Sequence, residues 1–355
     1  MTTVADIIGA LSAIAPFDKA AGWDAVGLQV GDPRAAAGRV AVCHDATPAV
    51  VDAAIEAGVG LLITYHPMLF EPTRSFVSGP HPAGRAYRLA AAGVALGTVH
   101  TAFDVAKGGA ADALAAAVGI SEPSGFGPMW GGDSAKVVTF VPAESVEGVA
   151  AAMATAGAGR IGNYSACSFR SRGVGAFTAG EGAEPEVGAL GANTAAEVRL
   201  EMNAAADTVD AVVTALVGAH PYEEPAYDVF ERRGDAAMLG RQGPITTTTL
   251  GELADTLAAE LVCRPRVAGD RAASISSAAV LPGSGDTFII DADADVVITG
   301  DVAHHQARAA LERGMAVIDA GHAATERPGV RALYAAVAQV TDPVDLTSVD
   351  ADPWT

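Results

Sequence analysis

Hydrophobic positions along the first 125 residues follow two alternating spacings. Apolar side chains near the N-terminus recur every three or four residues, which predicts an amphipathic helix that Pro16 ends. These side chains are Val4, Ile7, Ile8, Leu11 and Ile14. Beyond this helix, short β-branched runs alternate with Ala-rich stretches of helical spacing, which is typical of βα units and a parallel sheet. We expect strands at 39–44, 61–65 and 94–100, each followed by a helix, from Pro48, Pro82 and Gly108 respectively.

The same rhythm returns near the C-terminus. Strands are expected at 295–299 and 316–318, with helices from Val302 and over 328–338. We therefore assign the chain to the α/β class, with a split three-layer domain around a mainly parallel sheet. The two halves of this domain are residues 1–125 and 246–345, and residues 346–355 form a tail.

Residues 126–245 follow a different pattern. We expect strands at 136–141, 166–171, 173–178, 197–203 and 227–232, with helices at 143–156 and 208–217. Apart from one extra strand, this is the β-α-β-β-α-β order of a ferredoxin-like domain. The Gly-rich segments 125–132 and 240–243 are the expected connectors of this inserted domain.

Composition and charge exclude several classes of protein. Apolar residues make up 50% and charged residues 18% of the 355 residues, so the chain is globular rather than disordered. Twenty-two basic and 42 acidic residues give a formal charge of −20, which makes nucleic acid an unfavourable partner. Three isolated cysteines, no basic leader segment and no long apolar run indicate a cytoplasmic location and no membrane span.

Histidines and carboxylates collect where the predicted strands of the split domain end. Six of the eight histidines lie there. The strand-end groups are His44-Asp45, His66-Pro67, His100 with Asp104, Asp301 with His304-His305, and His322 with Glu326. Because the carboxyl ends of parallel strands form the ligand crevice of an open sheet, these side chains are candidates for one metal site. Imidazole and carboxylate without thiolate suit Zn, Fe, Mn, Co or Ni, and carboxylates can bridge two ions.

The spacing of His322 and Glu326 allows two interpretations. Four residues apart, the two side chains would share one face of a helical turn. Pro328 restricts that turn to the start of the helix. Alternatively, the segment is an ordinary helix start with Thr325 as the N-cap. The spacing alone does not choose between them.

Several of these segments resemble the GTP cyclohydrolase 1 type 2 homologue family. The motifs of the split domain that carry the resemblance are Gly22-Trp23-Asp24-Ala25-Val26-Gly27-Leu28-Gln29-Val30-Gly31, His66-Pro67, His100-Thr101-Ala102-Phe103-Asp104, Thr299-Gly300-Asp301 with His305, and Asp319-Ala320-Gly321-His322 with Thr325-Glu326. Those of the insert are Gly159-Arg160-Ile161-Gly162-Asn163-Tyr164 and His220-Pro221-Tyr222-Glu223-Glu224-Pro225-Ala226-Tyr227. They span nearly the whole chain, in the order in which the family has them.

The resemblance implies a toroidal homohexamer with a dinuclear metal centre. Two divalent ions per chain would be held by metal ligands at His66, Asp104, His322 and Glu326. His100, in the same pocket, would be the catalytic residue. Family members usually have a His where this chain has Tyr65, so Tyr65 is the fifth candidate metal ligand. A phenol must lose a proton, from a reference pKa of about 10, before it coordinates well, so the metal position nearest Tyr65 is expected to be the less occupied one.

The residues predict a metal-dependent hydrolase. The resemblance implies that its substrate is a nucleotide, in the manner of a GTP cyclohydrolase. The alternative is a non-catalytic protein that binds or delivers metal, or a hexameric scaffold.

Three further features have simpler interpretations than a binding motif. Residues 157–162 read G-x-G-x-x-G, but they follow a predicted helix and precede a strand, the reverse of the dinucleotide-binding order. Residues 282–286 lack the Lys-Ser/Thr of a Walker A loop and are expected to form a tight turn, whose backbone amides can line the pocket. His220 is expected to be a loop residue, with a role at an interface or an entrance as the alternative.

Overall fold

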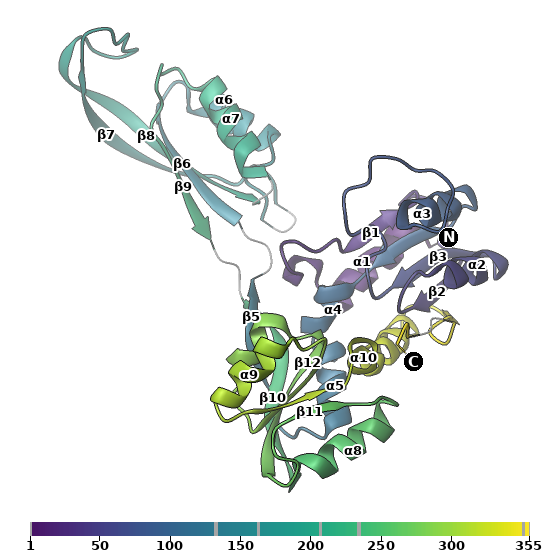
Figure 1. Cartoon of the computed structure of the whole chain (residues 1–355). Coiled ribbons are helices and arrows are strands. Elements are labelled where there is room, and N and C mark those ends of the chain that lie inside the picture. The colour runs from purple at the N-terminus through teal and green to yellow at the C-terminus, as the bar shows by residue number, and fades with distance from the viewer. Residues whose placement is uncertain are drawn as a thin grey trace. The chain divides into compact units, whose positions relative to one another are not determined.

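The computed structural model divides the chain into two compact units. It describes residues 2–130, 134–161, 164–205, 208–232, 236–349 and 352–354. Residues 1–129 and 236–355 form one unit, and residues 130–235 form the other (Figure 1). Residues 126–129 and 236–245, which the sequence analysis placed in the insert, thus belong to the first unit. The Gly131-Gly132 part of the predicted connector lies outside the described residues.

The N-terminal half of the first unit contains a five-stranded sheet of order β1-β4-β3-β2-β15. Its strands are β1 (Gly27–Val30), β2 (Arg39–Cys43), β3 (Val59–Thr64), β4 (Ala95–Thr98) and β15 (Val344–Asp345). Only β1 runs antiparallel to its neighbour. The helices are α1 (Val4–Ile14), α2 (Pro48–Glu56), α3 (Pro82–Ala91), α4 (His100–Val105) and α5 (Ala110–Val118), with a 3-10 turn, η1 (Phe17–Lys19).

The C-terminal half contains a six-stranded sheet of order β11-β14-β13-β12-β10-β5. Its strands are β5 (Ser124–Trp130), β10 (Ala236–Thr249), β11 (Arg266–Ala268), β12 (Ser274–Ser284), β13 (Val296–Gly300) and β14 (Ala316–Asp319). Strands β12, β13 and β14 are parallel. The helices are α8 (Leu250–Glu260), α9 (His304–Glu312) and α10 (His322–Val337), with a 3-10 turn, η3 (Asp286–Asp291).

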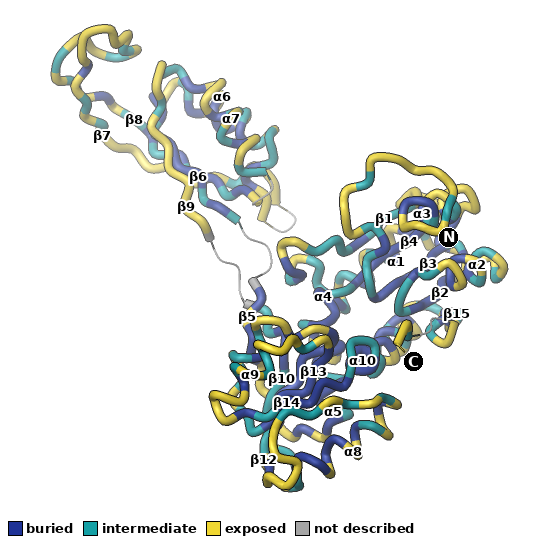
Figure 2. The backbone as a smooth tube through the Cα atoms, viewed as in Figure 1, coloured by how far each residue is buried: buried dark blue, intermediate teal, exposed yellow. Residues whose placement is uncertain are grey.

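The α/β class of the split domain is confirmed, and its mainly parallel strands are divided between two sheets. Alternating strand and helix patterns indicate parallel strands, yet they carry no information on which strands pair across 200 residues of chain. The parallel strands form the centre of each of the two sheets, where Figure 2 shows β2, β3, β13 and β14 as largely buried backbone.

Helix α10 joins the two halves of the first unit. Its residues Val330, Leu333 and Val337 pack in the core that contains α1, β2 and β3. Nearer its start, Ala324 packs in the core of the six-stranded sheet with α5 and α8. The N-terminus of α10 therefore lies where the two sheets approach each other.

The second unit is a four-stranded antiparallel sheet of order β7-β8-β6-β9. Its elements are β6 (Ser134–Pro142), α6 (Val146–Thr155), β7 (Phe169–Ala179), β8 (Gly191–Ala205), α7 (Val209–Ala219) and β9 (Tyr227–Arg232). This is the predicted β-α-β-β-α-β order, with the two short strands near 170 merged into β7. Helices α6 and α7 pack with one face of the sheet around Val137, Met153 and Leu216 (Figure 1).

None of the helices in the described ranges is long and apolar enough to cross a membrane.

Candidate metal centre

Three consecutive strand ends of the five-stranded sheet are tied together by backbone hydrogen bonds. The N–H of His66, just after β3, donates to the carbonyl of His44, just after β2, over 3.1 Å. The N–H of His100, just after β4, donates to the carbonyl of Tyr65 over 2.9 Å. The parallel register of β2, β3 and β4 thus places His44, His66 and His100 at one edge of the sheet.

The N-terminus of α10 brings a carboxylate to this edge. Gly321, at φ 91°, precedes the first helical residue His322, so Glu326 stands one turn along the same face. The first interpretation of the His322 and Glu326 spacing is therefore the one observed. The alternative cap does not form, because the hydroxyl of Thr325 donates to the carbonyls of Gly321 and His322 instead of capping the helix.

Glu326 is the centre of the cluster. It is only 3% exposed, and its two carboxylate oxygens contact three imidazoles. Oε2 lies 2.8 Å from Nε2 of His44. Oε1 lies 3.3 Å from Nε2 of His66 and 3.2 Å from Nε2 of His322. Burial alone would raise the pKa of Glu326, but these hydrogen bonds outweigh it and hold that pKa well below its usual range.

The imidazoles of His66 and His322 also have a carboxylate on their other nitrogen. Nδ1 of His66 lies 3.1 Å from Asp45, and Nδ1 of His322 lies 2.7 Å from Asp301. Burial lowers the pKa of His66, but the hydrogen bonds to Asp45 and Glu326 overcome it and raise that pKa to about 11. The hydrogen bond to Glu326 is the main cause that raises the pKa of His322 to about 9. Such carboxylates orient the rings of metal-binding histidines in other proteins.

The described side chains that best fit a metal ion are His44, His66 and Glu326. One candidate ligand atom from each lies within 4.8 Å of the other two. Imidazole and carboxylate are the donors that Zn, Fe, Mn, Co and Ni accept, and the buried Glu326 has no ion pair with a Lys or Arg among the described residues. The donor set therefore fits a divalent transition metal.

The remaining predicted ligands form an adjoining group. The buried Tyr65 hydroxyl donates a hydrogen bond to Asp104. Burial raises the pKa of Asp104 to about 7, and burial together with nearby Asp104 and Glu326 raises the pKa of Tyr65 well above 10. Tyr65 is thus a protonated hydrogen-bond donor here. Its ring centroid lies 5.2 Å from that of His66, which links the Asp104 group to the cluster around Glu326.

His100 lies next to His66, and its Nδ1 atom contacts a carboxylate. Its Nδ1 lies 2.8 Å from Asp24, which also accepts a hydrogen bond from the backbone of Thr101. The ring centroids of His100 and His66 are 5.3 Å apart. His100 has a φ of 33°, a conformation that costs energy for a residue with a side chain and that occurs preferentially at functional sites.

Two residues of the centre are missing from the ligand set with which the sequence analysis ended. His44 carried the same strand-end signal as the others, but it has no place in the ligand set that the resemblance implies. Gly283, in the turn predicted at 282–286, has a φ of 61°, and a Cβ on it would lie 2.5 Å from Oε1 of Glu326. No sequence signal marked this contact, because the turn and α10 meet only in the folded chain.

Other candidate residues are not members of the cluster. His304 and His305 begin α9, are exposed, and have ring centroids 5.3 Å apart. His220, in the second unit, donates from Nε2 to the Phe140 carbonyl and accepts at Nδ1 from the Tyr222 N–H, which makes it a buried loop-fixing residue. Residues 157–161 follow α6, as expected, while Gly162 and Asn163 lie outside the described residues.

We predict that Gly283→Ala lowers the amount of metal bound per chain, because the new methyl group would displace Glu326 from its imidazoles. Gly58→Ala is the matched control: Gly58 has a nearly identical φ of 62°, with nothing within 4 Å of its Cβ position. Both variants bear the same backbone strain, of order 1 kcal/mol. Metal analysis after identical dialysis is the measurement, and equal metal loss in both variants would contradict the prediction.

Comparisons with known proteins extend over the whole chain. Residues 2–353 match the family model Duf34/NIF3 (NGG1p interacting factor 3). The GTP cyclohydrolase 1 type 2 homolog of Mycobacterium tuberculosis is 36% identical, over 99% of this chain and 96% of the relative. That of Bacillus subtilis is 37% identical, over 89% and 87%. The crystal structure of a Bacillus cereus protein related to NIF3 superposes with a TM-score of 0.65 at 32% identity, covering 100% of this chain and 99% of that one.

Proposed function

Because this chain belongs to the Duf34/NIF3 family, we propose that it binds divalent transition metals and hydrolyses a phosphate-bearing substrate, a nucleotide. The observation that carries the proposal is the buried Glu326 carboxylate contacted by three imidazoles. Membership of the family confirms the resemblance read from the motifs. The substrate, the reaction and the number of ions are part of the proposal.

His44, His66 and Glu326 would hold one ion, with His322 on the same carboxylate oxygen as His66. The second ion of the dinuclear centre would lie toward Asp104. A divalent ion supplies Lewis-acid chemistry that stabilises negative charge developing on the substrate. Asp45 and Asp301 keep the rings of His66 and His322 in place through their Nδ1 atoms.

His100 is the proposed catalytic residue. Asp24 holds its Nδ1, and Nε2 has no hydrogen-bond partner within the described part of the chain. A histidine oriented by a carboxylate on one nitrogen can exchange a proton with a substrate on the other. His100 would thus act as the general acid or base beside the metal centre.

A small cavity supports the choice of a phosphate-bearing substrate. It has a volume of about 350 Å³, and its wall includes His44, Asp45, Arg327, Arg331, Thr347 and Ser348. Arg331 is exposed and makes no hydrogen bond or ion pair with any described residue. Asp352 also lines the cavity, and its carboxylate lies 3.7 Å from the guanidinium of Arg327. In a chain of charge −20, the guanidinium of Arg331 near His44 is therefore the group of this cavity that favours an oxyanion.

Non-catalytic metal binding or delivery is the second candidate. The burial of the cluster favours this second function, because the side chains of Glu326 and His44 are only 5% and 12% exposed. A closed donor set holds an ion without leaving an open position for a substrate.

A panel of nucleotides incubated with the metal-loaded chain separates the two candidates. We predict turnover of at least one nucleotide, lost on chelation. Arg331→Ala is expected to raise KM about tenfold with kcat and metal content retained, because it removes a charge-assisted hydrogen bond distant from the reacting atoms. Arg308→Ala, on the exposed surface of α9, is the control. Absence of turnover together with transfer of metal to an apo-acceptor would establish the second candidate instead.

We predict that Tyr65→His raises the metal content toward about two ions per chain, since a neutral imidazole coordinates without first losing a proton. His66→Ala should lower the content below that of the parent. Tyr65→Phe serves as the control, because it removes the hydroxyl that donates to Asp104 without adding a ligand. Metal analysis after identical dialysis decides: if Tyr65→His and the parent bind equal amounts, Tyr65 does not limit occupancy.

We also propose that the chain assembles as a closed homohexamer. The proposal is supported by two exposed aromatic side chains in the second unit, on the face of the sheet that its helices leave uncovered. Contact with another copy of the chain would bury them. Phe169 and Phe230 are 62% and 51% exposed, and their strand register places them opposite the face that α6 and α7 cover. Light scattering at micromolar concentration should give six times the chain mass of 35.5 kDa, whereas a monomeric mass across that range would refute the ring.

A further inference from the structure

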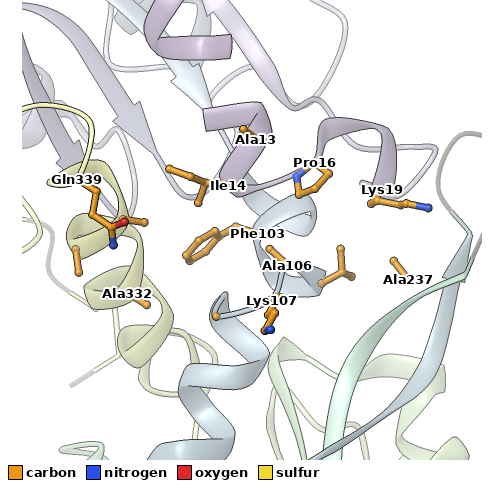
Figure 3. Close-up of a pocket in the computed structure, with 14 residues that line it drawn as sticks. Ala13, Ile14, Pro16, Lys19, Phe103, Ala106, Lys107, Ala237, Ala332 and Gln339 are labelled. Atoms are coloured by element: carbon orange, nitrogen blue, oxygen red, sulfur yellow. The ribbon is translucent and has the colours of Figure 1, made fainter. Parts of the chain in front are cut away.

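A cavity of the first unit shares no lining residue with the metal centre. It has a volume of about 720 Å³, the size of a pocket for a small organic molecule. Figure 3 shows its walls, which come from α1, α4 and α10, with Ala237 of β10 on one side. Phe103 stands in the middle of the wall, on α4. The next residue, Asp104, instead contacts Tyr65 of the metal-site group, so the two sites use different sides of one short helix.

The wall of this cavity is mainly apolar. Small side chains of α1 and α10 leave the space open, and Ile14, Pro16 and Phe103 supply the larger contacts. The alanines involved are Ala13, Ala332, Ala335 and Ala336. An aliphatic group buried here would be removed from water, which favours binding in proportion to the apolar area covered.

The charged side chains of the wall are of one sign. Lys19 and Lys107 line the cavity, and no Asp or Glu is among its lining residues in the described parts of the chain. This contrasts with the whole sequence, where acidic residues outnumber basic ones by 42 to 22. Lys107 is exposed, and it makes no hydrogen bond or ion pair with another described residue. Its ammonium group is therefore available to a ligand.

We propose that this cavity binds an amphipathic anion, a small molecule with an aliphatic body and a carboxylate or phosphate head. The body lies against Ile14, Phe103 and the alanines of α10, while the head meets the ammonium of Lys107, with Lys19 adding positive potential. A lysine acts as a point charge toward a carboxylate and a phosphate alike. The two lysines therefore explain why the ligand is negatively charged, but they do not select between the two head groups. The site does not depend on the proposed hydrolytic function.

Calorimetric titration of the full, metal-loaded chain with four ten-carbon probes tests the proposal. The probes are decanoate, decyl phosphate, decanol and decyltrimethylammonium, all below their micellar concentrations. We expect decanoate or decyl phosphate to bind and the tighter of the two to identify the head group. We expect decanol to bind more weakly and the cation not at all. Binding of all four probes with equal affinity, or of none, would overturn the proposal.

Three variants, two at Lys107 and one at Ala335, locate the binding. Lys107→Ala should weaken binding of the anionic probe about threefold to tenfold, and Lys107→Arg should retain it. Ala335→Phe, at an exposed position of α10 that lines the cavity, should abolish it by filling the space. Thermal unfolding verifies that each variant is folded, and metal content should be unchanged in all three. If the variants alter the mass of the assembly while probe binding stays unchanged, the cavity is covered by a second copy and the proposal is wrong.

Discussion

The buried carboxylate of Glu326 is the constraint on which the metal centre depends. Removing an ionised carboxylate from water costs several kcal/mol unless opposite charge and hydrogen bonds compensate. Among the described residues, Glu326 receives that compensation from three imidazoles and from no lysine or arginine. Asp45 and Asp301 stand behind two of these imidazoles, so the cluster as a whole needs further positive charge. Protons on the histidines or a divalent cation can supply it, and the donor set suits the cation.

The fold serves this constraint by bringing together the two ends of the chain. Glu326 is 282 residues from His44 and 260 residues from His66. Helix α10 bridges that separation because its apolar side chains pack in the cores of both sheets while its first turn carries His322 and Glu326. The insert forms a compact unit of its own, and none of its described residues belongs to the cluster. Metal binding to such a site would stabilise the association of the two halves, which couples it to folding.

The sequence predicted the parts of this site that follow from local pattern and strand direction. His66, His100 and His44 end consecutive parallel strands, and parallel strands place their carboxyl ends at one edge. The same argument included His304 and His305, which lie exposed at the start of α9, because a strand end in a second sheet need not face the same crevice. The approach of Gly283 to Glu326 and the hydrogen bond from Tyr65 to Asp104 depend on tertiary packing, so no spacing along the chain could have revealed them. The resemblance to a known family named His66, Asp104, His322 and Glu326, but not His44.

The most direct test of the central claim is anomalous X-ray diffraction from crystals soaked in Zn²⁺ or Mn²⁺, with data collected on both sides of the metal's absorption edge. The account predicts an anomalous peak within about 2.0–2.3 Å of Nε2 of His66 and of a carboxylate oxygen of Glu326, with His44 as a further ligand. A peak only at exposed histidines such as His304 and His305, with none beside Glu326, would contradict it.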